Sequence, residues 1–195
     1  SFMKKRKKNL YFLKKYLTDF SNLIKPTKEI LGQLLKVRDI FLQTSKKKGK
    51  ILIFGNGGSS AIASHVSVDL TKNAKIRCTN YNESDLITCF SNDFGYERWV
   101  EMTVKYYGNK GDVLIVISSS GKSKNMINAC IAARKKKFSK IITLTGHLVN
   151  NPVKKLGDIN LWVNSKAYNY IENIHQFWLL SLVDLVIGKK NYLPK

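Results

Sequence analysis

The stretch GDVLIVISSSGKS, at residues 111–123, changes from an apolar run into a turn rich in serine and glycine. Residues 112–117 predict a buried strand, and the polar pattern after the turn predicts a helix over 124–136. Strands that are apolar along their whole length are typical of a parallel sheet covered on both faces. The stretch therefore predicts a strand, a tight loop and a helix in an α/β fold.

The same alternation continues on both sides of this stretch. We expect further strands at 50–54, 86–90, 141–146 and 159–163, and helices at 60–72, 96–107 and 167–188. Apolar residues at three-to-four spacing predict helices over 4–48, broken at Pro26. The pattern predicts an α/β fold, a three-layer α-β-α sandwich with a central, mostly parallel five-stranded sheet preceded by N-terminal helices. We expect a single domain over 1–195, with helices at 1–48 and the α/β core at 49–195.

Composition excludes several classes of protein. The chain has 195 residues, 44% of them hydrophobic, which excludes disorder along its whole length. Three widely spaced cysteines form no disulfide framework, and no run approaches the ~20 apolar residues of a membrane span. We therefore expect a cytoplasmic protein without a membrane anchor. The net charge of +21 suits anionic substrates, but the lysine clusters lack interleaved aromatics, so we do not expect specific nucleic-acid binding.

The serine-rich turn has the chemistry of a phosphate site. Its hydroxyls and backbone N–H groups meet at a helix N-terminus, whose partial positive charge favours an anion. The spacing of a Walker loop is missing. The alternative is an ordinary strand-to-helix turn with a capping serine.

A second glycine-rich turn, GNGGSS at 55–60, follows the expected strand at 50–54. It lacks the full GxGxxG pattern and the acidic residue about twenty positions later that a dinucleotide site needs. We therefore expect no nucleotide cofactor. Since ligands of parallel sheets bind beyond the carboxyl ends of the strands, both turns are expected at the binding edge.

Two pairs of titratable residues lie at helical spacing. His65 and Asp69 are four apart, a spacing that suits either a Zn²⁺ site or a simple hydrogen bond. Glu172 and His175 are three apart on the last, mostly apolar helix, where they are candidates for perturbed pKa values. The alternative is that Glu172 pairs with a lysine and that His175 packs at an interface.

Together these motifs resemble the sugar-isomerase (SIS) domain family, in the branch that holds the phosphoheptose isomerases and the DnaA initiator-associating protein. The resemblance covers almost the whole chain. It is carried by FGNGGSSAIASHVSVDL at 54–70, SNDFGYERW at 91–99, the stretch at 111–123 and YIENIHQFWLLSLVDLV at 170–186. It implies a homotetramer with active sites at subunit interfaces and a sugar phosphate as substrate.

Carried over by position, the resemblance implies two sets of substrate-binding residues. Those that hold the phosphate are Ser118, Ser119, Ser120 and Ser123. Those that line the sugar are Asn56, Gly57, Ser59, Asn92 and Asp93.

The chain departs from the family at the metal and acid–base positions. Phosphoheptose isomerases place zinc between a His and a Glu on the first core helix and a Gln and a His on the last. The corresponding positions here hold His65, Asp69, Glu172 and Leu180. If zinc is present, His65, Asp69 and Glu172 would bind it, with His175 as a candidate fourth ligand. The family's distal catalytic His is replaced by Leu180.

The Glu-x-x-His pair also resembles the base-bearing helix of other SIS isomerases. In that scheme Glu172 takes the proton next to the carbonyl, a cis-enediol forms, and His65 or His175 moves the hydroxyl proton. Asp69 stands where the family has a catalytic Glu. Glu172 cannot be both free base and zinc ligand, so the two schemes compete.

Three functions follow, in order of preference. The first is isomerisation of sedoheptulose 7-phosphate to heptose 7-phosphate. The second, favoured by Glu172, is isomerisation of another sugar phosphate in surface-polysaccharide synthesis. The third, favoured by Leu180, is a non-catalytic phosphosugar-binding adaptor.

Overall fold

The computed structural model describes residues 2–193 and contains a five-stranded sheet. The strands are β1 (Ile51–Gly55), β2 (Cys78–Thr79), β3 (Val113–Ser118), β4 (Lys140–Thr145) and β5 (Ile159–Trp162). Their order is β2-β1-β3-β4-β5, and every neighbouring pair is parallel. The predicted parallel sheet is confirmed.

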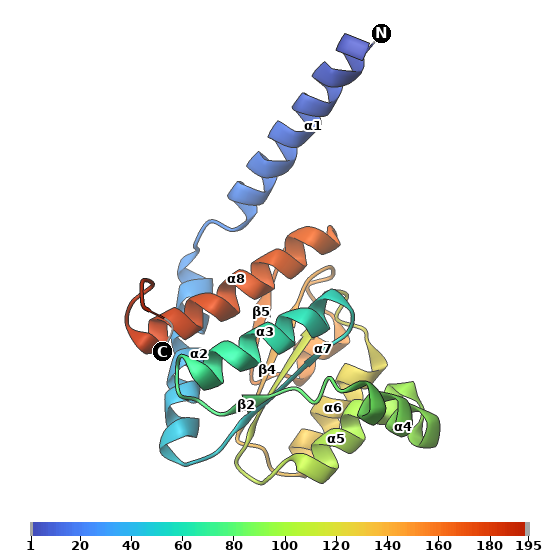
Figure 1. Cartoon of the computed structure of the whole chain (residues 1–195), viewed down its shortest axis with the longest axis vertical. Coiled ribbons are helices and arrows are strands. Elements are labelled where there is room, and N and C mark those ends of the chain that lie inside the picture. Colours follow the sequence, from blue (N-terminus) through green and yellow to red (C-terminus); the bar gives the residue numbers. More distant parts are fainter. Residues whose placement is uncertain (1, 194–195) are drawn as a thin grey trace.

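Helices cover both faces of this sheet (Figure 1). Within residues 2–193 they are α1 (Phe2–Leu23), α2 (Lys28–Lys46), α3 (Gly58–Lys72), α4 (Ser84–Phe94), the 3₁₀ helix η1 (Tyr96–Arg98), α5 (Trp99–Tyr107), α6 (Lys124–Lys135), α7 (Pro152–Leu156) and α8 (Tyr168–Ile187). Helices α2, α3 and α8 pack on one face, and α5, α6 and α7 pack on the other.

Alternate residues of each strand feed two separate cores, because successive side chains of a strand point to opposite faces. Ile51 and Ile53 of β1 join the core under α2, α3 and α8. Leu52 and Phe54 join the core under α5 and α6. All four are fully buried, so the three-layer sandwich is confirmed.

The strand predicted at 86–90 is wrong. These residues belong to α4, and the short edge strand β2 lies earlier, at Cys78–Thr79. Leu86 is buried and Phe90, four residues later, packs against the same core. A short apolar run fits the spacing of a strand or that of a helix. Here its apolar residues form the buried face of a helix.

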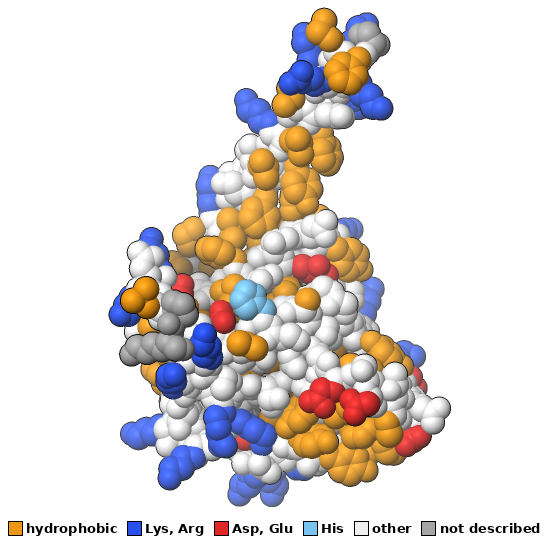
Figure 2. Space-filling model, viewed as in Figure 1, with side chains coloured by type: hydrophobic (Ala, Val, Ile, Leu, Met, Phe, Trp, Pro, Cys, Tyr) orange, Lys and Arg blue, Asp and Glu red, His pale blue; other side chains and the backbone are white. Residues whose placement is uncertain are grey.

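Helix α1 projects away from the body of the molecule (Figure 1). None of its residues is buried, and Leu10, Leu13 and Leu17 are 59%, 54% and 65% exposed. Apolar side chains accordingly line the projecting helix, with lysines gathered at its tip (Figure 2). Its C-terminal end contacts α8, where the Tyr170 hydroxyl donates to the Tyr16 carbonyl over 2.6 Å.

The register brings the two predicted loops to one edge. Gly55 pairs with Ile117, so β1 and β3 end side by side. The glycine turn and the serine turn therefore both open at the carboxyl edge of the sheet. Within residues 2–193, no helix has the length and apolar character that crossing a membrane requires.

Candidate active site

The serine loop joins β3 to α6. Ser118 and Ser119 are buried, and the Ser118 hydroxyl donates to the Ser123 hydroxyl over 3.2 Å. The Ser119 hydroxyl is buried and finds no hydrogen-bond partner among residues 2–193. Ser123 is the N-cap of α6, but its side chain makes no capping bond. Unused hydroxyl and N–H donors at a helix N-terminus suit a phosphate.

The shape of this loop depends on Gly121. Its φ of +67° is in the left-handed region, and an added Cβ would stand 2.2 Å from Asn151 side-chain atoms. Asn151 is fully buried; it donates to Thr145 Oγ1 over 3.0 Å and accepts from Lys154 N over 2.8 Å. The buried amide therefore supports the loop from behind. Asn151 followed by Pro152 also signals α7, which our sequence analysis missed.

A pair of amides ties the glycine turn to the serine loop's helix. Asn56 donates to Asn125 over 3.0 Å, and Asn125 donates back over 2.8 Å. The Tyr96 hydroxyl also donates to Asn56 Oδ1, over 3.0 Å. Asn56, predicted to line the sugar, is thus held in place at the edge between the two loops.

The carboxylate of Glu172 lies directly against the N-terminus of α3. A Cβ added to Gly58, the first residue of that helix, would stand 2.4 Å from Glu172 Oε2. A side chain at position 58 would displace the carboxylate. Gly57 is the N-cap, and Ser59 is buried beneath the turn. A carboxylate at this position faces the positive end of the helix dipole.

One turn further along α8, three polar side chains meet. Gln176 Nε2 is 3.0 Å from His65 Nδ1, and His65 Nε2 is 3.4 Å from Asp69 Oδ2. The His65 side chain is 49% exposed, so it remains accessible from solvent. The predicted pair is confirmed as a contact, and Gln176 is a partner that our sequence analysis missed. Its position four residues after Glu172 was the available signal.

His175 has a different environment. It is fully buried, and its Nε2 donates to the Thr145 carbonyl over 3.0 Å. Burial lowers its pKa from 6.5 to about 4, against a smaller opposite effect of the Thr145 carbonyl. The ring is therefore neutral at pH 7 and closed off from solvent.

Asn92 and Asp93 are exposed at the end of α4. Asn92 donates to Asp93 over 3.0 Å, and Asp93 Oδ2 is 3.8 Å from the Cys89 sulfur. The structure brings neither of them into hydrogen-bond contact with the two loops within the described chain.

The structure does not bring the predicted zinc ligands together. His65 and Asp69 are neighbours, but the Glu172 carboxylate is packed on Gly58, and Leu180 is packed against the core. Residues 2–193 contain no group of three His, Cys, Asp or Glu side chains placed to hold a metal ion. The zinc site therefore stays a prediction.

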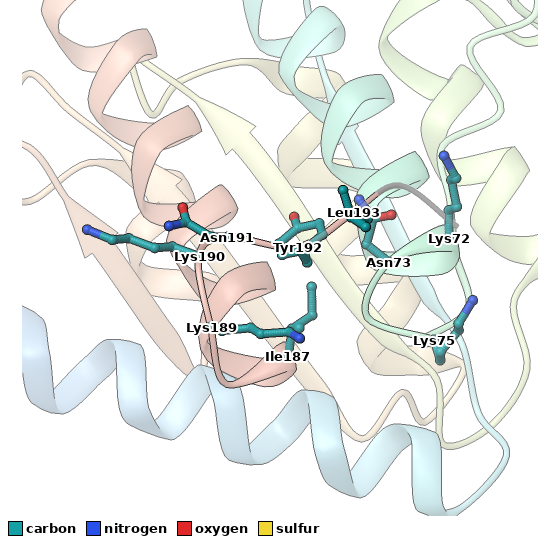
Figure 3. Close-up of a pocket in the computed structure, with 9 residues that line it drawn as sticks. All are labelled: Lys72, Asn73, Lys75, Ile187, Lys189, Lys190, Asn191, Tyr192 and Leu193. Carbon is teal, nitrogen blue, oxygen red and sulfur yellow. The ribbon is translucent and has the colours of Figure 1, made fainter.

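A separate basic cavity of about 850 Å³ lies at the opposite edge of the molecule, where α3 and α8 end (Figure 3). Its lining includes Lys72, Lys75, Lys189 and Lys190. The lysine side chains extend in different directions rather than toward one point (Figure 3). The glycine turn and the serine loop lie at the carboxyl edge of the sheet, away from this cavity. We therefore place the candidate active site at the carboxyl edge.

Comparison with known proteins agrees with this geometry. Residues 15–146, more than half of the chain, match the SIS domain family. The chain belongs to the SIS domain family. It is 39% identical over 165 residues to a phosphoheptose isomerase of Glaesserella parasuis serovar 5 (strain SH0165), which covers 82% of this chain and 83% of that protein.

Other relatives place this SIS domain protein in the phosphoheptose isomerase branch. A phosphoheptose isomerase of Aliarcobacter butzleri (strain RM4018) is 35% identical over 169 residues, which is 84% of this chain and 88% of that protein. The structure of a phosphoheptose isomerase from Francisella tularensis matches with a TM-score of 0.78 and 26% identity, over 94% of this chain and 98% of that one.

The buried His175 predicts a pH-dependent stability. The pKa of His175 is depressed in the folded state. Its contribution to the free energy of unfolding is therefore present above pH 6.5 and is lost as pH falls toward 4. Between pH 7 and pH 5 the wild type should lose about 2 kcal/mol of unfolding free energy more than His175→Gln. Denaturant titrations of both proteins at the two pH values measure this difference. Equal losses would show that His175 is not buried as a neutral ring.

Proposed function

We propose that this protein is a phosphoheptose isomerase, which interconverts sedoheptulose 7-phosphate and heptose 7-phosphate. The observation that carries the proposal is the serine loop, whose buried Ser119 hydroxyl has no partner within residues 2–193 and which opens at the sheet edge where the Glu172 carboxylate lies against Gly58. The names of the relatives support the same reaction. The substrate's phosphate and its reacting carbons thus each have a candidate site.

The serine loop would bind the phosphate. The unpartnered Ser119 hydroxyl and the uncapped start of α6 supply donors, and Ser118, Ser120 and Ser123 add hydroxyls around them. Asn56, Gly57 and Ser59 would line the sugar from the neighbouring turn. An anchored phosphate fixes the sugar chain and so brings its first two carbons to one place for proton transfer.

Glu172 would act as the base. Its carboxylate takes a proton from C1 of the ketose, the C–H electron pair becomes the C1=C2 bond, and the carbonyl oxygen on C2 gains a proton. The cis-enediol then loses the proton of its C1 hydroxyl, the C1 carbonyl forms, and Glu172 returns its proton to C2. The isomerisation is redox-neutral overall, so it needs no oxidant or reductant. This is general acid–base catalysis by one carboxyl group.

His65 would move the hydroxyl protons, since its side chain is half-exposed and contacts Gln176 on the helix that carries Glu172, with Asp69 beside its Nε2. His175 is fully buried, so we assign it to packing between α8 and the end of β4. This assignment leaves catalysis with Glu172 and His65, supported by Asp69.

We also infer a homotetramer, in which α1 packs against other copies. Support comes from the exposed leucines of α1 and from the absence of any buried residue in that helix. Active sites at subunit interfaces would also let a partner approach Asn92 and Asp93. The three cysteines are free thiols, which supports our expectation of a reducing, cytoplasmic setting.

Replacing the base tests the reaction. Glu172→Gln keeps the size of the side chain but removes the proton acceptor, so kcat should fall at least 10²-fold, the lower end of general-base effects. NMR in D₂O follows the aldose anomeric signal and deuterium entry next to the carbonyl. If the wild type turns over only other ketose phosphates, the result would favour an isomerase for another sugar phosphate. If it binds a sugar phosphate without deuterium exchange, the result would favour a non-catalytic adaptor.

Gly58→Ala tests the contact between α3 and Glu172. The new Cβ must displace the carboxylate, so kcat should fall about tenfold or more while the fold is kept. Gly32→Ala is the matched control, because no described atom lies within 4 Å of the added Cβ. It should gain about 0.5–1 kcal/mol of stability, as alanine favours helix, and keep full activity. Unchanged kcat in Gly58→Ala would contradict the proposed position of the base.

We expect the exposed leucines of α1 to hold the tetramer together. Leu10, Leu13 and Leu17 lie on one helical face, and replacing all three with Gln should convert the tetramer into smaller species. Light scattering after size exclusion measures the mass. Replacing Lys4, Lys8 and Lys15 with Gln, on the opposite face, is the control. A tetramer in the leucine variant, or a monomer in the wild type, would overturn the inferred assembly.

A further inference from the structure

The hydrogen bond between Gln176 and His65 joins the two helices that carry the proposed acid–base groups. Gln176 Nε2 of α8 is 3.0 Å from His65 Nδ1 of α3, and the other ring nitrogen faces Asp69 Oδ2 at 3.4 Å. Both edges of an exposed imidazole are thus engaged by side chains of this chain.

The contact with Gln176 determines which nitrogen carries the proton. The Gln176 amide nitrogen only donates, so Nδ1 must be the acceptor. In the neutral ring Nε2 then carries the hydrogen, on the side that faces Asp69 Oδ2. The arrangement selects the Nε2–H tautomer and a single ring orientation.

The position of Gln176 on α8 supports a role in the site. Glu172, Gln176 and Leu180 follow one another at four-residue spacing and so form one stripe along the helix. Glu172 meets Gly58 and Gln176 meets His65, whereas Leu180 packs against the core. The first two positions of the stripe contact α3, and the third packs against the core.

We propose that Gln176 is a positioning residue, which holds the His65 ring in one tautomer and one orientation for proton transfer to the sugar hydroxyls. The catalytic part of this inference rests on the function proposed above. The orientation of the ring does not. Because a half-exposed hydrogen bond contributes little to folding, the loss of Gln176 should affect the ring more than the stability of the protein.

The test compares the full-length wild type with Gln176→Met, which keeps the length of the side chain and removes the donor. Diethyl pyrocarbonate acylates free imidazole nitrogens, and mass spectrometry of the labelled peptides gives the rate at His65. We expect slow labelling in the wild type and labelling at least threefold faster in Gln176→Met. The control is Asn173→Ala, since Asn173 is exposed on the same helix and donates to the Asn169 carbonyl. It should label like the wild type.

Kinetics supply the second measurement. Gln176→Met should lower kcat five- to tenfold with KM within twofold of the wild type, because the substrate still binds but the proton-transfer group is misoriented. A merely structural residue would not separate the two constants in this way.

The outcomes separate this inference from the proposed function. Equal labelling of His65 in the wild type and Gln176→Met overturns the positioning role, even if the wild type isomerises the substrate. Protected His65 in a wild type that shows no isomerisation supports the ring geometry and overturns the proposed function. Faster labelling with unchanged kcat shows that Gln176 orients the ring without serving catalysis, which overturns the catalytic half of the proposal.

Discussion

The contact of the Glu172 carboxylate with Gly58 is the constraint on which the site depends. The carboxylate occupies the space that a Cβ at position 58 would take, so a side chain there would displace it. One turn further along α8, Gln176 lies within hydrogen-bond distance of His65. The contacts between α3 and α8 thus set both the place of the proposed base and the geometry of the second acid–base group.

The parallel sheet supplies the second half of the arrangement. Because β1 and β3 end in register, their loops open side by side, and the Asn56–Asn125 pair ties them together. Asn151 supports the serine loop from the other side, where Gly121 has no room for a side chain. The phosphate loop is therefore preorganised by buried amides, whereas the His65 side chain is about half-exposed.

Much of this architecture could be predicted from the sequence, because apolar strands followed by glycine- or serine-rich turns have few other interpretations. The run at 86–90 could not be settled that way, since its apolar residues fit a strand or one face of a helix. Glu172 and His175 show a second limit. Their spacing places them near one face, but only the packing of α8 shows that Glu172 reaches the first turn of α3 while His175 is buried against Thr145. Gln176 was missed because its partner lies 111 positions away in the sequence.

The proposed reaction requires one sugar phosphate to span the serine loop and the Glu172 carboxylate. The most direct measurement is a crystal structure of Glu172→Gln with sedoheptulose 7-phosphate, in which turnover is suppressed and the ligand persists. We expect the phosphate to lie among residues 118–123 and the first two carbons of the sugar to lie beside residue 172. A phosphate bound instead in the lysine-lined cavity where α3 and α8 end, or a sugar with those carbons turned away from residue 172, would contradict it.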